Sequence, residues 1–82
     1  MNTVKERVRT IITEELGCLA EEIGDDVSVA DLGADSLHCV EIVMALEEDF
    51  DIEIQDQEAE SLMTVNDMVA YLKGRGFTDE NS

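Results

Sequence analysis

The sequence has few positive charges, few cysteines and no proline. Its 82 residues include 5 Lys or Arg against 21 Asp or Glu, and the formal net charge is −16 at pH 7. Such a surface repels nucleic-acid phosphates and anionic lipids, so nucleic acid and membranes are poor candidates as partners. Two cysteines are too few for a fold built on disulfides. We therefore expect a cytoplasmic protein that folds without disulfides.

Long apolar runs are also missing. No segment approaches the roughly 18 apolar residues that a membrane-spanning helix needs, and we expect neither a signal peptide nor membrane insertion. The length predicts one domain, which we place at residues 1–77, and we expect 78–82 to be a flexible polar tail. We also expect a monomer, because two surfaces of this charge repel each other.

The charge is unevenly distributed along the chain. From Thr10 to Leu72 there are 18 Asp or Glu and no Lys or Arg. Like charges at this density destabilise a compact state. Two explanations remain open at this point: the acidity serves solubility alone, or it steers basic partners towards one face.

The first predicted helix begins at a capping box, in which Thr3 and Glu6 can each satisfy a backbone N–H. Gly17 can adopt the left-handed conformation that ends a helix. Between them, apolar residues recur at helical spacing. Residues 19–34 have no sustained period, and we expect an ordered loop there. Four apolar side chains should hold it on the core: Ile23, Val27, Val29 and Leu32.

A second helix is predicted from Asp35 or Ser36 to Asp49 or Phe50, because a good N-cap is followed by strong helix formers. Its core-facing stripe is Cys39, Ile42, Val43, Leu46 and Phe50. A separate stripe on the same helix is Leu37, Glu41, Met44 and Glu48. Met44 fits either a small partner-binding patch or the edge of the core.

Alternation over 50–54 favours an extended segment, but a single strand has no partner here. We expect a tight connection with its apolar side chains turned inward. Asp56 can cap one short helical turn over 56–60, and Thr64 can cap the last helix. The predicted fold class is all-α: a small four-helix bundle of three long helices and one short helix, with a long ordered loop between the first two helices.

Catalytic chemistry has few candidate residues. The single histidine, His38, is adjacent to Cys39, and neighbouring positions on a helix do not face each other. Cys39 is more simply a small apolar core residue. His38, Cys39 and Cys18 lack the usual spacing of metal ligands, and the chain has no Gly-rich phosphate loop. We expect no enzyme, no catalytic residue and no dedicated metal site.

A calcium-binding interaction module is an alternative from a different class. Asp49, Asp51, Glu53 and Glu60 occupy positions 1, 3, 5 and 12 of an EF-hand frame. Position 6, where the loop needs glycine for its sharp turn, is Ile54. The frame is therefore broken at the residue on which its geometry depends.

Ser36 lies between the long loop and the second helix, in the run Asp31-Leu32-Gly33-Ala34-Asp35-Ser36-Leu37. A serine at this point can simply be a cap or a first-turn residue. The positive end of a helix also favours a phosphate esterified to such a serine. This run, together with residues 40–48, resembles bacterial acyl carrier proteins of dissociated fatty acid synthesis, and the likeness extends from Ile11 to Tyr71.

The resemblance implies a carrier without catalysis of its own. A phosphopantetheinyl transferase would attach 4′-phosphopantetheine from coenzyme A to Ser36, with Asp35 and Leu37 beside it, and the arm would hold acyl chains as thioesters. General fatty acid synthesis is the leading interpretation. A specialised carrier for a dedicated pathway, such as lipid A, a polyketide or an unusual acyl product, is the alternative.

The resemblance also implies an acyl pocket and a partner face. By position, the candidates to line the pocket are Cys39, Val43, Leu46, Ile54, Ala59, Leu62, Met68 and Tyr71. Acyl-transfer and chain-elongation enzymes with basic patches would dock on the second helix. The residues expected at that face are Asp35, Leu37, His38, Glu41, Met44, Glu47 and Glu48. The family often has an acidic residue in place of His38, threonine in place of Cys39 and proline in place of Gln55.

Overall fold

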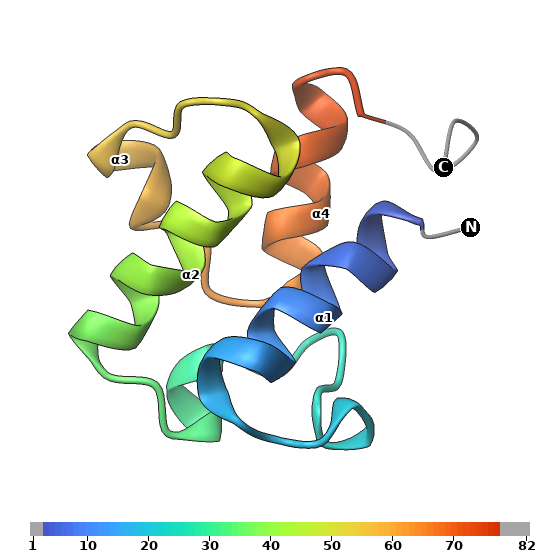
Figure 1. The fold of residues 1–82 in the computed structure, drawn as a ribbon, viewed down its shortest axis with the longest axis vertical. Coiled ribbons are helices and arrows are strands. Elements are labelled where there is room, and N and C mark those ends of the chain that lie inside the picture. The colour runs from blue at the N-terminus through green and yellow to red at the C-terminus, as the bar shows by residue number, and fades with distance from the viewer. Residues whose placement is uncertain (1–2, 78–82) are drawn as a thin grey trace.

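The computed structural model describes residues 3–77, and its regular structure is helical (Figure 1). The helices are α1 (Val4–Leu16), α2 (Ser36–Phe50), α3 (Asp56–Ala59) and α4 (Val65–Gly74). Two short 3-10 turns, η1 (Ala20–Glu22) and η2 (Val29–Leu32), order the long connection from α1 to α2. This arrangement confirms the predicted bundle of three long helices and one short helix. The predicted tail at 78–82 lies outside the described residues.

The capping residues predicted for α1 and α4 are confirmed. The Glu6 N–H donates to Thr3 Oγ1 at 3.1 Å, and the Asp67 N–H donates to Thr64 Oγ1 at 3.0 Å. Gly17 ends α1 with a φ of 69°, in the left-handed region that favours glycine. Within residues 3–77, no helix has both the length and the apolar character needed to cross a membrane.

The cap predicted for α3 is wrong by one residue. Gln55 is the N-cap, and Asp56 is already the first helical residue. The Gln55 N–H donates to Glu58 Oε1 at 3.3 Å, so the Glu58 side chain reaches back over the start of the helix. Because Asp56 is already part of the helix, its carboxylate cannot serve as the N-cap, a position that requires extended backbone before the first turn.

The core lies where α1 packs against α2 and α4, with α3 beside α2 (Figure 1). Of the predicted α2 stripe, Ile42, Leu46 and Phe50 are buried, whereas Cys39 and Val43 are half-buried. The connection after α2 buries Ile54, as predicted. The long loop is fixed by two buried side chains, Ile23 and Val29, and by the half-buried Val27 and Leu32.

Arg7 fastens α1 to the end of α2. Its Nε lies 2.9 Å from Asp49 Oδ2, and its Nη2 donates to the Asp49 carbonyl at 2.9 Å. The guanidinium carbon lies 3.9 Å from the centroid of the Phe50 ring, a cation–π contact. Phe77, which the sequence pattern does not place, packs edge-on against Phe50 with 5.0 Å between ring centroids.

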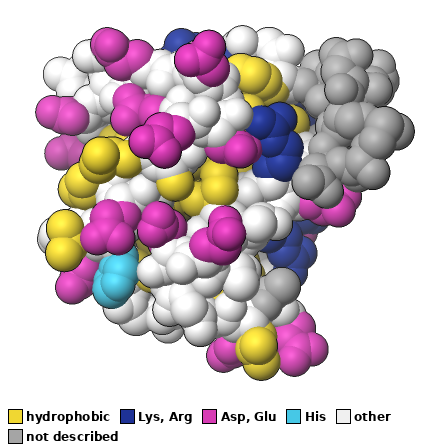
Figure 2. Space-filling view, in the orientation of Figure 1, with side chains coloured by type: hydrophobic (Ala, Val, Ile, Leu, Met, Phe, Trp, Pro, Cys, Tyr) yellow, Lys and Arg dark blue, Asp and Glu magenta, His cyan; other side chains and the backbone are white. Residues whose placement is uncertain are grey.

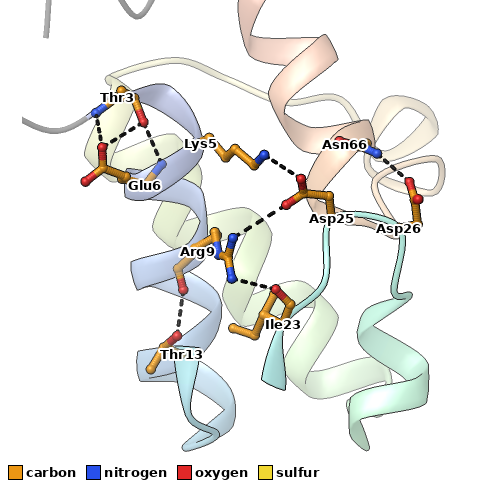
Figure 3. A network of polar contacts seen from close by, with 9 residues as sticks. All are labelled: Thr3, Lys5, Glu6, Arg9, Thr13, Ile23, Asp25, Asp26 and Asn66. Carbon is orange, nitrogen blue, oxygen red and sulfur yellow. Dashed lines mark hydrogen bonds and ion pairs between the residues drawn. The ribbon is translucent and has the colours of Figure 1, made fainter. Parts of the chain in front are cut away.

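Two further cations of α1 hold the long loop (Figure 3). Lys5 pairs with Asp25, and Arg9 Nη1 lies 3.5 Å from the same carboxylate. Arg9 Nη2 also donates to the Ile23 carbonyl at 2.7 Å. On the other side of this loop, the Asn66 amide donates to Asp26 at 2.5 Å. The few positive charges of α1 therefore join α1 to the end of α2 and to the long loop. α2 and α3 themselves contain no Lys or Arg.

Candidate functional site

Ser36 is the first residue of α2 and is exposed. The η2 turn before it ends at Gly33, which has a φ of 95°, and the Gly33 N–H donates back to the Ala30 carbonyl at 3.1 Å. This turn fixes the direction from which the chain enters α2. Within residues 3–77, the Ser36 hydroxyl takes no hydrogen bond, and the side chain is open to solvent.

Asp35, not Ser36, caps α2. Its Oδ1 accepts from the His38 N–H at 2.9 Å, and the Asp35 N–H donates to His38 Nδ1 at 3.4 Å. The hydrogen bond from the His38 N–H holds the pKa of Asp35 below its ordinary value. Capping therefore does not account for the serine at position 36, because its neighbour already performs that task.

We expect Asp35→Ala to lower the melting temperature at pH 7 by about 4–8 °C, through loss of the cap. A carboxyl whose pKa is lowered on folding stabilises the fold above its ordinary pKa of about 3.9, and this contribution is lost as pH falls through the lower folded value. The difference in melting temperature between Asp35→Ala and wild type should therefore disappear below about pH 4. Thermal denaturation followed by circular dichroism from pH 7 to pH 3 measures it.

Asp31→Ala is the matched control for this prediction. Asp31 is exposed in the η2 turn, and its carboxylate makes no hydrogen bond to the described residues. Its replacement removes the same charge without removing a cap, so it should not lower the melting temperature at pH 7. An equal, pH-dependent difference in both variants would contradict a specific role for the Asp35 cap.

Two cavities lie along α2: the larger is between α2 and α3, and the smaller is between α2, η2 and residues 59–68. The larger has a volume of about 420 Å³ and is lined by Cys39, Val40, Val43, Met44, Glu47, Ile54, Asp56, Ala59 and Glu60. The smaller has a volume of about 140 Å³ and is lined by Val29, Ala30, Cys39, Ile42, Val43, Ala59, Glu60, Leu62, Met63 and Met68. They share four residues, Cys39, Val43, Ala59 and Glu60, so the two cavities adjoin.

Six of the eight predicted pocket residues line these cavities. Four of them line the larger cavity: Cys39, Val43, Ile54 and Ala59. Leu62 and Met68 line the smaller one. Leu46 and Tyr71 line neither. Leu46 lies in the core, whereas Tyr71 connects two helices.

Tyr71 fixes α3 relative to α4. Its hydroxyl donates to Glu58 Oε1 at 3.1 Å and accepts from Arg75 Nη1 at 2.7 Å. Burial raises the pKa of Tyr71, and the hydrogen bond to Glu58 raises it further, while Arg75 acts in the opposite direction. Arg75 also donates to the Glu53 carbonyl at 3.2 Å. This chain of contacts holds the short helix beside both cavities.

The exposed side of α2 combines apolar and acidic residues. Leu37, Val40 and Met44 form an exposed row, here called the α2 apolar row, and Leu37 is 64% exposed. Figure 2 shows apolar side chains among acidic ones over the left and centre of this view, with Lys and Arg at the top and towards the right. Glu48 and Asp35 are exposed, as expected for a partner face. Val40 was missed, although its spacing from Leu37 and Met44 is that of one helix face.

Two predicted partner-face acids, Glu47 and Glu41, differ in what their side chains contact. Glu47 Oε2 accepts from the Ile54 N–H at 2.8 Å, so this carboxylate is engaged in holding the connection after α2. Glu41 lines a shallow hollow of about 210 Å³ with Glu15, Met44, Ala45 and Glu48. Glu15 comes from α1, and only the packing of α1 on α2 brings it to this face.

The calcium frame does not form a metal centre in the described residues. Among residues 3–77 there is no group of three or more His, Cys, Asp or Glu arranged to hold a metal ion. Asp49, at the first position of the frame, pairs with Arg7 instead.

The sequence over residues 6–72 matches the model of a family described as "Phosphopantetheine attachment site". Among solved structures, the fold is similar to the NMR structure of the HMG-ACPI domain from the CurA module of Lyngbya majuscula, with a TM-score of 0.81. That match has 19% sequence identity and covers 96% of this chain and 79% of the other. At this identity the likeness supports the fold alone.

Proposed function

Because the chain belongs to the family of phosphopantetheine-attachment carrier domains, which hold a covalently attached phosphopantetheine group, we propose that Ser36 is the attachment residue. Its free, exposed hydroxyl at the start of α2 carries the proposal. The other serines within residues 3–77 are engaged: Ser28 Oγ accepts from the Ala30 N–H, and Ser61 Oγ donates to the Glu58 carbonyl.

The residues around Ser36 suit a phosphodiester at this point. The first turn of α2 provides the partial positive charge of a helix N-terminus, which favours an anion in an otherwise acidic molecule. Asp35 holds that turn in place, and Leu37 presents an apolar side chain next to the attachment point. When bound, the group supplies a thiol on a long arm, to which acyl chains are attached as thioesters.

The two adjoining cavities offer shelter for an acyl chain. Their shared residues Val43 and Ala59 present apolar surface, and an apolar chain gains free energy when it leaves water for such a lining. The contact between Tyr71 and Glu58 joins α3 to α4, which holds α3 in the position where it lines both cavities. Carrier domains of this family are generally not catalysts themselves.

We propose that the carrier serves general fatty acid synthesis in the cytoplasm, as a monomer. Its partners would be a phosphopantetheinyl transferase and acyl-transfer and chain-elongation enzymes with basic patches. The acidic surroundings of the α2 apolar row support such partners, because opposite charges steer association. A specialised carrier is the second candidate, favoured by His38 and Gln55, which depart from the pattern of fatty acid carriers. Analysis of the acyl groups on carrier purified from its native source discriminates between the two.

The test of attachment is the intact mass before and after incubation with coenzyme A and a broad-specificity phosphopantetheinyl transferase. Wild type should gain the mass of one phosphopantetheine group, and Ser36→Ala should gain none. Ser61→Ala is the matched control, an exposed serine that should not affect the gain. A Ser36→Ala chain that still gains the group would place the attachment elsewhere. No gain in wild type with several transferases would contradict the proposal.

A further inference from the structure

Cys39 stands where the two cavities meet. It lines both of them, is half-buried and carries a free thiol. It is also three residues after Ser36 on α2, a spacing that puts two side chains on the same side of a helix, with about 5–6 Å between their Cβ atoms. The cavities that would shelter an acyl chain therefore begin one helical turn from the proposed attachment point, with Cys39 in their wall.

We propose that Cys39 forms an intramolecular disulfide with the thiol of the attached phosphopantetheine, giving a closed state of the unacylated carrier under oxidising conditions. This inference rests on the proposed attachment at Ser36. In the closed state the arm is held against the cavities and its thiol can accept no acyl group. A reductant restores the open state.

The reaction requires a disulfide oxidant, such as oxidised glutathione. One protein thiolate attacks the oxidant and releases one molecule of reduced glutathione. The second protein thiolate then displaces the other glutathione, so that one S–S bond forms within the protein and one is lost from the oxidant. Two thiol hydrogens pass to the two glutathione molecules. A carrier whose arm is acylated has no free thiol there and cannot close.

Closure within one molecule is favoured over two competing reactions. A disulfide between the arms of two carriers must bring together two molecules of net charge −16, which repel each other. Cys39 and the arm are instead joined through the short stretch of α2 that separates them, which gives a high effective concentration. Cys18, which is also free and half-buried, follows the end of α1 and lines neither cavity.

The experiment compares four chains that have been loaded, that is, given the phosphopantetheine group by the transferase. They are wild type, Cys39→Ser, Cys39→Ala and the matched control Cys18→Ser. Each is equilibrated with oxidised and reduced glutathione, treated with a thiol-alkylating reagent and weighed intact without reductant. Loaded wild type should lose the mass of two hydrogen atoms and take up two fewer alkyl groups than its reduced form. Cys18→Ser should close in the same way. Both Cys39 variants should retain an alkylatable arm or a glutathione adduct and show no closure.

Each failure has a distinct meaning. A wild-type chain that never gains the phosphopantetheine mass overturns the proposed attachment and this inference with it. A chain that is loaded but shows only glutathione adducts, or species of twice the mass, overturns this inference alone. So does closure that persists in Cys39→Ala and is lost in Cys18→Ser. Circular dichroism of each variant establishes that it is folded.

Discussion

Leu46→Ala is expected to lower the free energy of unfolding by about 2–5 kcal/mol, the usual cost of removing a buried leucine side chain. Leu46 is 1% exposed and lies in the core that α2 shares with α1. Small domains are stable by only about 5–15 kcal/mol, and a charge of −16 weakens the compact state further. The variant should therefore contain a measurable unfolded population. Urea denaturation followed by far-ultraviolet circular dichroism gives the difference.

Leu37→Ala makes the same chemical change on the same helix and serves as the matched control. Leu37 is 64% exposed, so its truncation should change the free energy of unfolding by no more than about 0.5 kcal/mol. Equal losses in the two variants would contradict the assignment of Leu46 to the core and Leu37 to the surface. Leu37→Ala should affect partner binding instead, because it removes one side chain of the α2 apolar row.

Local signals explain why most helix boundaries could be predicted from the sequence. The cap pairs of α1 and α4 lie within four consecutive residues, so their hydrogen bonds depend on little besides local geometry. The start of α3 was misplaced by one residue because aspartate is a common capping residue, whereas Gln55, the observed N-cap, makes no side-chain capping hydrogen bond. Phe77 could not be placed, because its contact with Phe50 joins distant parts of the chain.

The candidate site was predictable to a similar extent. Helical spacing puts Cys39 and Val43 on one side of α2, and both line the cavities. Leu46 was named as a pocket candidate only through the resemblance to acyl carrier proteins, whereas helical spacing had put it on the core stripe, where it lies. Glu15 was missed because it joins the hollow on α2 only through the packing of another helix.

The second large effect is expected at the partner face. Glu41→Lys combined with Glu48→Lys should slow association with a basic partner by about 10–100-fold at low salt, because complementary charge accelerates encounter by such factors. Both carboxylates line the hollow beside Met44, and Glu48 is exposed. The partner to use is the transferase that loads the carrier, with stopped-flow measurement of the association rate. The effect should fade towards 1 M salt, where the Debye length falls to about 3 Å.

The control must change the net charge equally without touching this face. Glu14→Lys combined with Glu21→Lys does so, because both residues are exposed, on the α1 and η1 segments, and neither lines the hollow. If acidity steers partners to α2, only the first pair should slow association strongly, while the control pair changes it little. If acidity serves solubility alone, neither pair should slow it. Equal slowing by both pairs would mean that total charge, rather than its placement around the α2 apolar row, governs the encounter. The experiment therefore separates steering of basic partners from solubility, the two explanations of the acidity that composition leaves open.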